Sequence, residues 1–145
     1  MQKRVIIKNT EPAAYQAMYG LEKYLKQSNI DKIHLQLIKI RASQINKCAY
    51  CINMHTKEAL EVGETNQRIF LLNAWRETEI FTEEEKSILE LCEEVTLIHN
   101  NGVSDKTYQN LLNYFDENYI AKLIMAIVTI NSWNRISVSI NKEID

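Results

Sequence analysis

Apolar residues recur every three or four positions along most of the chain, which is the spacing that lines one face of an α-helix. Thr10 is placed to cap the first such stretch, and Thr82 and Glu85 have the spacing of a capping box. The pattern predicts an all-α, single-domain bundle (1–145) of about seven helices, preceded by an extended N-terminal arm over residues 1–9. We expect the helices near residues 10–27, 31–45, 48–62, 65–75, 82–98, 104–115 and 116–135.

Two stretches depart from a simple amphipathic pattern. Ile33, Leu35 and Leu37 alternate as in a strand, but no turn residue interrupts the run to Ile45, and its length favours a buried helix. The last helix is apolar almost all round between residues 123 and 130. Such a helix is buried, either at the centre of a domain or against another subunit.

The composition agrees with long helices and argues against a β-rich fold and against several classes of binding protein. Only three glycines and one proline occur in 145 residues, whereas a β-sandwich or barrel needs frequent turns. The net charge of −2 does not favour binding to nucleic acid or to an anionic membrane. The start of the chain does not resemble a signal peptide, and no apolar run of about eighteen residues predicts a membrane-spanning helix. We therefore expect a cytoplasmic protein.

The residues best suited to chemistry lie between Asn46 and His55. Cys48 and Cys51 stand three positions apart, and His55 follows four positions after the second cysteine. At the start of a helix these side chains would share one patch, where the helix dipole favours a thiolate. A thiol pair with a neighbouring base is suited to disulfide chemistry. Two alternatives stay open from the residues alone: structural thiols, and half of a metal site, although no second ligand pair follows at zinc spacing.

The run from Arg41 to Thr56, RASQINKCAYCINMHT, strongly resembles the alkylhydroperoxidase D-like branch of the carboxymuconolactone decarboxylase family. A CxxC pair alone would be a weak signal, but the whole run, followed in order by tryptophan–arginine segments, is specific. The similarity continues downstream in the segments 63–65, 74–77, 81–83 and 131–135.

The resemblance implies an all-helical fold that assembles as a homotrimer or homohexamer. It implies a thiol-dependent peroxidase that reduces organic hydroperoxides in antioxidant defence, with no bound cofactor. In the family's scheme Cys51 is the nucleophile, Cys48 resolves the resulting sulfenic acid as a disulfide, and His55 relays the proton. A dithiol reductant protein, with a lipoyl group or another dithiol, would then restore the thiols.

This chain departs from the family pattern at two positions. Gln36 stands twelve positions before the first cysteine, where the family commonly carries glutamate. Glutamine cannot accept a proton, and general-base help is worth roughly a hundred- to ten-thousand-fold. Lys47 stands where the family often has glycine, and its charge would lower the pKa of a neighbouring cysteine.

Other functions stay open, most of them because glutamine stands in place of the family's glutamate. They are a CxxC disulfide reductase, a redox-sensing or metal-binding module with weak peroxidase activity, an interaction protein that has lost catalysis and, less favoured because of the dithiol, a lactone decarboxylase.

Other polar and sulfur-containing residues are expected to be structural. Cys92 lies on an apolar helix face and is expected to be a small core residue. Tyr50 is expected to point away from the cysteines that flank it, and His34 to face solvent. Glu93 and Glu94 are expected to belong to a solvated helix face.

Overall fold

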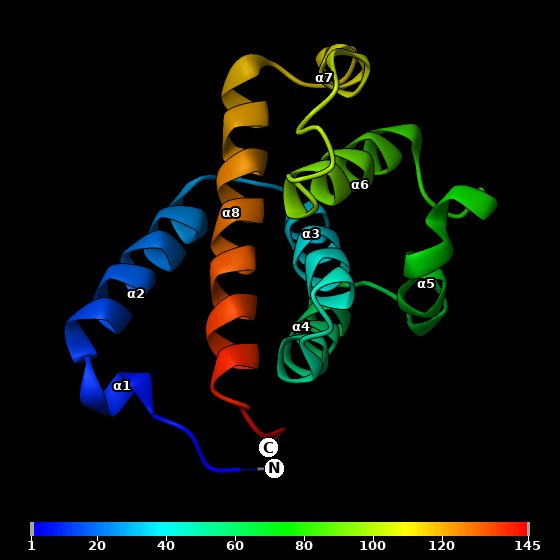
Figure 1. Ribbon diagram of the computed structural model, residues 1–145. Helices are drawn as coiled ribbons and strands as arrows, with labels where there is room; N and C mark the ends of the chain where they lie inside the picture. Colours follow the sequence, from blue (N-terminus) through cyan, green and yellow to red (C-terminus); the bar gives the residue numbers. More distant parts are fainter. Residues whose placement is uncertain (1, 145) are drawn as a thin grey trace.

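The computed structural model describes residues 2–144, and every regular element within them is helical (Figure 1). The seven expected helices are all present, so the all-α prediction is confirmed. The fourth of them begins as an α-helix and continues as a 3-10 helix. The elements are α1 (Ile7–Thr10), α2 (Pro12–Gln27), α3 (Lys32–Ile45), α4 (Ala49–Glu61), α5 (Asn66–Leu71), η1 (Leu72–Glu77), α6 (Glu83–Thr96), α7 (Asp105–Leu112) and α8 (Glu117–Ser139).

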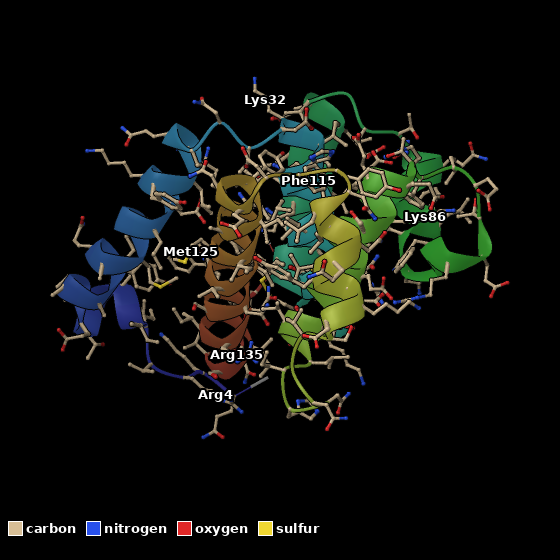
Figure 2. All side chains as sticks on the ribbon, turned by 90° about the horizontal axis from the view of Figure 1, so that it is seen from above. Arg4, Lys32, Lys86, Phe115, Met125 and Arg135 are labelled. Atoms are coloured by element: carbon tan, nitrogen blue, oxygen red, sulfur yellow. A yellow bond between two sulfur atoms is a disulfide. The ribbon has the colours of Figure 1, made fainter. Side chains whose placement is uncertain are left out.

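The prediction for the N-terminal arm is wrong in one respect. Residues 2–6 have no regular secondary structure, but the chain then makes one helical turn, α1, which ends at Thr10. Thr10 therefore does not cap α2, and Glu11, at the N-cap, makes no side-chain capping bond. The arm lies against the end of α8, because Arg4 Nη1 donates to the Ser139 carbonyl at 2.7 Å (Figure 2).

Helix α8 runs through the middle of the bundle, with α2 on one side and α3, α4 and α6 on the other (Figure 1). Its apolar residues Leu123, Ala126 and Ile127 are completely buried. The all-round apolar stretch is thus explained largely by a central position in the domain, although Val128 remains 40 % exposed. No helix among residues 2–144 is long and apolar enough to cross a membrane.

Helix α3 contributes to two apolar clusters at once. Ile38 and Ala42 pack with residues of α6 and α8, whereas Leu37 and Ile40 pack with residues of α4, η1 and α6. A helix that is covered on two sides needs apolar residues in both directions. This double burial explains why the sequence of α3 alternates in a way that imitates a strand.

Two predictions of solvent-facing groups are wrong. His34 bonds through Nδ1 to the Tyr119 hydroxyl at 2.9 Å and joins α3 to α8. Glu94 accepts hydrogen bonds from the start of α7. Glu93 joins α3 and η1 to α6 through hydrogen bonds from three side chains, those of Arg41, Trp75 and Arg76.

Candidate functional site

The turn between α3 and α4 places Cys48 at the start of α4. The Cys48 N–H donates to the Ser43 carbonyl at 3.0 Å and the Lys47 N–H donates to the Gln44 carbonyl at 3.2 Å, the pair of bonds that defines a Schellman motif. The motif requires one residue in the left-handed region, and Lys47 supplies it with φ of 54°. Glycine takes this conformation freely, whereas a lysine does so at a cost of about 1 kcal/mol.

Buried amides hold this turn against α8. Asn46 Nδ2 donates to the side-chain oxygens of Asn131 and Asn134, both at 2.9 Å, and Asn134 Nδ2 donates to Ser43 Oγ at 3.0 Å. Each such bond contributes about 1 kcal/mol, and an unpaired buried amide would cost more. The segment 131–135, which looked like a distant part of the family pattern, therefore fixes the position of the cysteine turn.

Cys48 and Cys51 form a disulfide, with their Cα atoms 5.3 Å apart. Cys48 is the N-cap residue of α4, and its sulfur accepts the Cys51 N–H at 3.3 Å. The N–H groups of a first helical turn stabilise negative charge, so the same position favours a thiolate after reduction. Both cysteines are almost fully buried, at 1 % and 2 % exposure.

His55 lies one turn after Cys51 on α4 and is buried. Its Nδ1 is 2.8 Å from Oε2 of Glu58, one further turn along the helix. Because an ionised carboxylate can only accept, the ring carries its proton on Nδ1 and keeps Nε2 as a base. The hydrogen bond with His55 lowers the pKa of Glu58, against the opposing effect of burial.

Gln36 is buried on α3 beside this histidine–carboxylate pair. Its amide, like the ammonium group of Lys39, helps to lower the pKa of Glu58. The Gln36 Oε1 atom is buried and has no hydrogen-bond partner among residues 2–144. The histidine therefore has a carboxylate partner, but on α4 rather than α3. Sequence reasoning missed Glu58, although its spacing of three residues from His55 on one helix could have pointed to it.

A cavity of about 270 Å³ opens beside Cys51, His55 and Glu58. Its wall is rich in aromatic side chains from α2, α4 and α8. Tyr15 and Tyr19 of α2 lie against the ring of Trp133 of α8, with ring centroids 5.4 and 6.0 Å away. The other lining residues are Glu22, Lys39, Tyr50, Met54, Ser137 and Lys142.

Cys48 does not line this cavity but a second hollow of about 200 Å³. Lys47 also lines it, and Tyr50, Ser137 and Lys142 line both hollows. The prediction that Tyr50 points away from the site is therefore wrong. The ammonium group of Lys142 lies over the Tyr50 ring, 3.9 Å from its centroid, in a cation–π contact.

The third cysteine lies elsewhere. Cys92 is completely buried on α6, with its sulfur 3.5 Å from the Ile38 carbonyl, as expected of a core residue. Burial raises the pKa of its thiol to about 12. Among residues 2–144, no group of three or more histidine, cysteine or acidic side chains is arranged to hold a metal ion.

The family model for carboxymuconolactone decarboxylases matches residues 12–94. The chain belongs to this family. The uncharacterised protein YdfG of Bacillus subtilis is 45 % identical to this chain over 139 residues, which cover 96 % of this chain and 95 % of YdfG. The carboxymuconolactone decarboxylase resemblance that rested on residues 41–56 is thus confirmed.

Solved structures agree with this family. A protein of unknown function from Agrobacterium tumefaciens, named as a candidate antioxidant defence protein AhpD, superposes with a TM-score of 0.96, with 36 % identity and 99 % of both chains covered. The debrominase Bmp8 has a TM-score of 0.84 over 94 % of this chain and 74 % of its own, but it is only 16 % identical. The likeness to Bmp8 extends to the fold alone.

Proposed function

We propose that this chain is a thiol-dependent peroxidase that reduces organic hydroperoxides through a dithiol–disulfide cycle. The observation that carries the proposal is the arrangement around α4. A cysteine pair stands at the helix start, and one of its members shares a cavity with a histidine and a carboxylate. A thiolate, a base and room for a substrate are the parts that such a cycle needs.

The first step uses Cys51 as the nucleophile. Its thiolate attacks the terminal oxygen of the hydroperoxide, the O–O bond breaks, and the electron pair leaves on the alkoxide oxygen. The alkoxide takes a proton and departs as the alcohol, which leaves a sulfenic acid on Cys51. Cys51 is favoured over Cys48 for this step because it lines the larger, apolar cavity together with His55.

The second step uses Cys48 as the resolving thiol. Its sulfur attacks the sulfenic acid sulfur of Cys51, a new S–S bond forms and water leaves. The Cα separation of 5.3 Å supports this step, because it lies within the ordinary range for a disulfide and this backbone therefore accommodates the bond. One hydroperoxide and two thiols thus give one alcohol, one water and one disulfide.

His55 moves the protons, and Glu58 holds it ready to do so. A carboxylate bonded to Nδ1 fixes the ring's tautomer and stabilises the imidazolium that forms when Nε2 takes a proton. Gln36 at the position of the family's glutamate does not remove this function, because Glu58 supplies the negative charge from the same helix as the histidine. Glu58 is thus a positioning residue, and Cys51, Cys48 and His55 are the catalytic residues.

Steady-state consumption of cumene hydroperoxide with a small dithiol as reductant tests the proposal. Wild-type protein and the Cys92→Ser variant are expected to turn over at the same rate, because Cys92 is buried in the core. Cys51→Ser is expected to be inactive. Full turnover by Cys51→Ser would refute the assigned roles. Absence of turnover in the wild type, with normal reduction of disulfide substrates, would favour a disulfide reductase instead.

A further inference from the structure

The two sulfurs of the disulfide are approached from different hollows. Cys51 lines the aromatic cavity of about 270 Å³, and Cys48 lines the second hollow of about 200 Å³. A peroxidase cycle needs two different encounters, one with a hydroperoxide and one with a reductant. If both used one opening, each would obstruct the other.

We infer that the dithiol reductant attacks Cys48 through this second hollow, while the hydroperoxide meets Cys51 in the aromatic cavity. This inference rests on the proposed dithiol–disulfide cycle. It assigns the second hollow to a thiolate-bearing reductant and one sulfur to its attack.

Charge is the first argument. The second hollow is lined by Lys47 and Lys142 and by no acidic residue. Both lysines are exposed, and neither forms an ion pair with another residue of the described range 2–144. The nucleophile in disulfide exchange is an anion, the thiolate, so it is attracted to this hollow. The aromatic cavity is also lined by two lysines, Lys39 and Lys142, but there the carboxylates of Glu22 and Glu58 offset their charge.

The direction of attack is the second argument. A thiolate approaches a disulfide sulfur from the side opposite to the sulfur that leaves. Attack on Cys48 is therefore made from the side away from Cys51, which is where a hollow lined by Cys48 and not by Cys51 is useful. Attack on Cys51 would instead require the reductant to enter between the aromatic rings of α2 and α8.

The leaving group is the third argument. When the thiolate bonds to Cys48, the S–S bond breaks and the electron pair leaves on Cys51. Exchange is faster when the departing thiolate is stabilised or protonated as it leaves. Cys51 lies in the first turn of α4 and shares a cavity with His55, whose imidazolium can return a proton to it.

The cycle closes with the second thiol of the reductant. Its thiolate attacks the reductant's own sulfur in the mixed disulfide, and the Cys48 thiolate leaves. The reductant has then lost two electrons and two protons and become a disulfide, while Cys48 and Cys51 are both thiols again.

A monothiol captures the first step, because it has no second thiol with which to release itself. Protein oxidised with diamide is mixed with glutathione, quenched in acid within seconds and alkylated with N-ethylmaleimide. Cleavage after Tyr50 separates the two cysteines for mass spectrometry. We expect glutathione on Cys48 and N-ethylmaleimide on Cys51. Glutathione on Cys51, or equally on both, would overturn the inference.

Charge variants test the role of the hollow. Lys47 lines only the second hollow, and Lys47→Asn, which tolerates the left-handed conformation, is expected to slow the reaction with anionic glutathione about threefold. Lys142→Gln, at a lysine that lines both hollows, is expected to slow it by a similar factor. The reaction with cationic cysteamine is expected not to slow. Lys57→Gln, an exposed lysine of α4 outside both hollows, is the matched control and should change neither rate. Equal effects on the two thiols would contradict the electrostatic argument.

Failure of this inference can be told apart from failure of the peroxidase proposal. Diamide forms the disulfide without any hydroperoxide, so the position of the glutathione adduct is measured even in a protein that does not reduce peroxides. Glutathione on Cys48 in such a protein would support the assignment of the hollow and refute only the peroxidase.

Discussion

The chain carries sulfur in two very different settings. Cys48 and Cys51 lie in the first turn of α4, beside backbone N–H groups, lysines and two hollows. Cys92 lies in the middle of α6, packed among apolar residues of α3 and α8, where burial raises the pKa of its thiol to about 12. All three are almost completely buried, so burial alone does not separate reactive thiols from inert ones. The difference is that Cys48 and Cys51 lie at a helix N-terminus beside open hollows, whereas Cys92 lies within a helix in the apolar core.

The largest expected effect separates the two members of the reactive pair. Cys51→Ser is expected to lower turnover of cumene hydroperoxide at least about a thousandfold, because no other thiol can replace the nucleophile. Without added reductant, Cys48→Ser is expected to react once and stop at the sulfenic acid, because Cys92 is too deeply buried to resolve it. Trapping with dimedone measures this stalled species. A Cys51–Cys92 disulfide in oxidised Cys48→Ser would contradict the contrast between the two settings.

The next effect concerns access to the thiols. In reduced native protein at pH 8.5, iodoacetamide is expected to modify Cys48 and Cys51 and to leave Cys92 unmodified until denaturant is added. The reason is that thiolate is the reactive form, and a pKa of about 12 leaves almost none on Cys92. Peptide mass spectrometry after timed quenching gives the three rates. Comparable rates at all three cysteines in folded protein would contradict this difference between the two settings.

A smaller effect tests the positioning of His55. Glu58→Gln is expected to lower kcat/KM about tenfold at pH 7, because the imidazolium loses its charged partner. Glu58→Asp is expected to recover part of the rate. Glu61→Gln, an exposed change on the same helix, is the control.

The exchange of two side chains sharpens this test. Gln36 lies beside Glu58. The double variant Gln36→Glu/Glu58→Gln therefore places the carboxylate on α3 and the amide on α4, the reverse of the wild type. We expect this double variant to be more active than Glu58→Gln alone. Additive effects of Gln36→Glu and Glu58→Gln in the double variant would show that a carboxylate on α3 cannot replace Glu58.

The smallest effect is on stability. The folded-state pKa of Glu58 is lowered, so its contribution is present above the ordinary glutamate pKa of about 4.3 and is lost as pH falls through the lower folded value. Because the Glu58 side chain is 41 % exposed, screening limits this contribution to about 0.5 kcal/mol. Urea unfolding should show a larger cost of Glu58→Gln at pH 7 than at pH 3. An equal cost at both pH values would contradict this electrostatic origin.

The helices were predictable because local signals agreed with packing. Capping residues such as Asp31 and Thr82 are followed by helical apolar spacing, and both form their expected caps. The one-turn helix α1 has no buried residue, so no periodic spacing of apolar residues predicts it. The short 3-10 continuation after Leu71 likewise follows from packing of Leu72 and Trp75 rather than from a local signal.

The site was predictable only where its residues are close in the chain. Cys48, Cys51 and His55 follow from spacing on one helix, whereas the aromatic wall brings together α2, α4 and α8. Charged residues were misjudged for the same reason. Glu93 was expected to face solvent, but its partners Arg41, Trp75 and Arg76 come from other elements and cannot be found by inspecting α6 alone.

The most direct test of the proposed cycle is a thiol count and intact mass on fully reduced protein, before and after one equivalent of cumene hydroperoxide. The three cysteines of the chain are expected to give three thiols before and one after, with the loss of two hydrogens in mass. Cys51→Ser should block this change. No loss of thiols over several minutes, or an undiminished loss in Cys51→Ser, would contradict the proposed peroxidase.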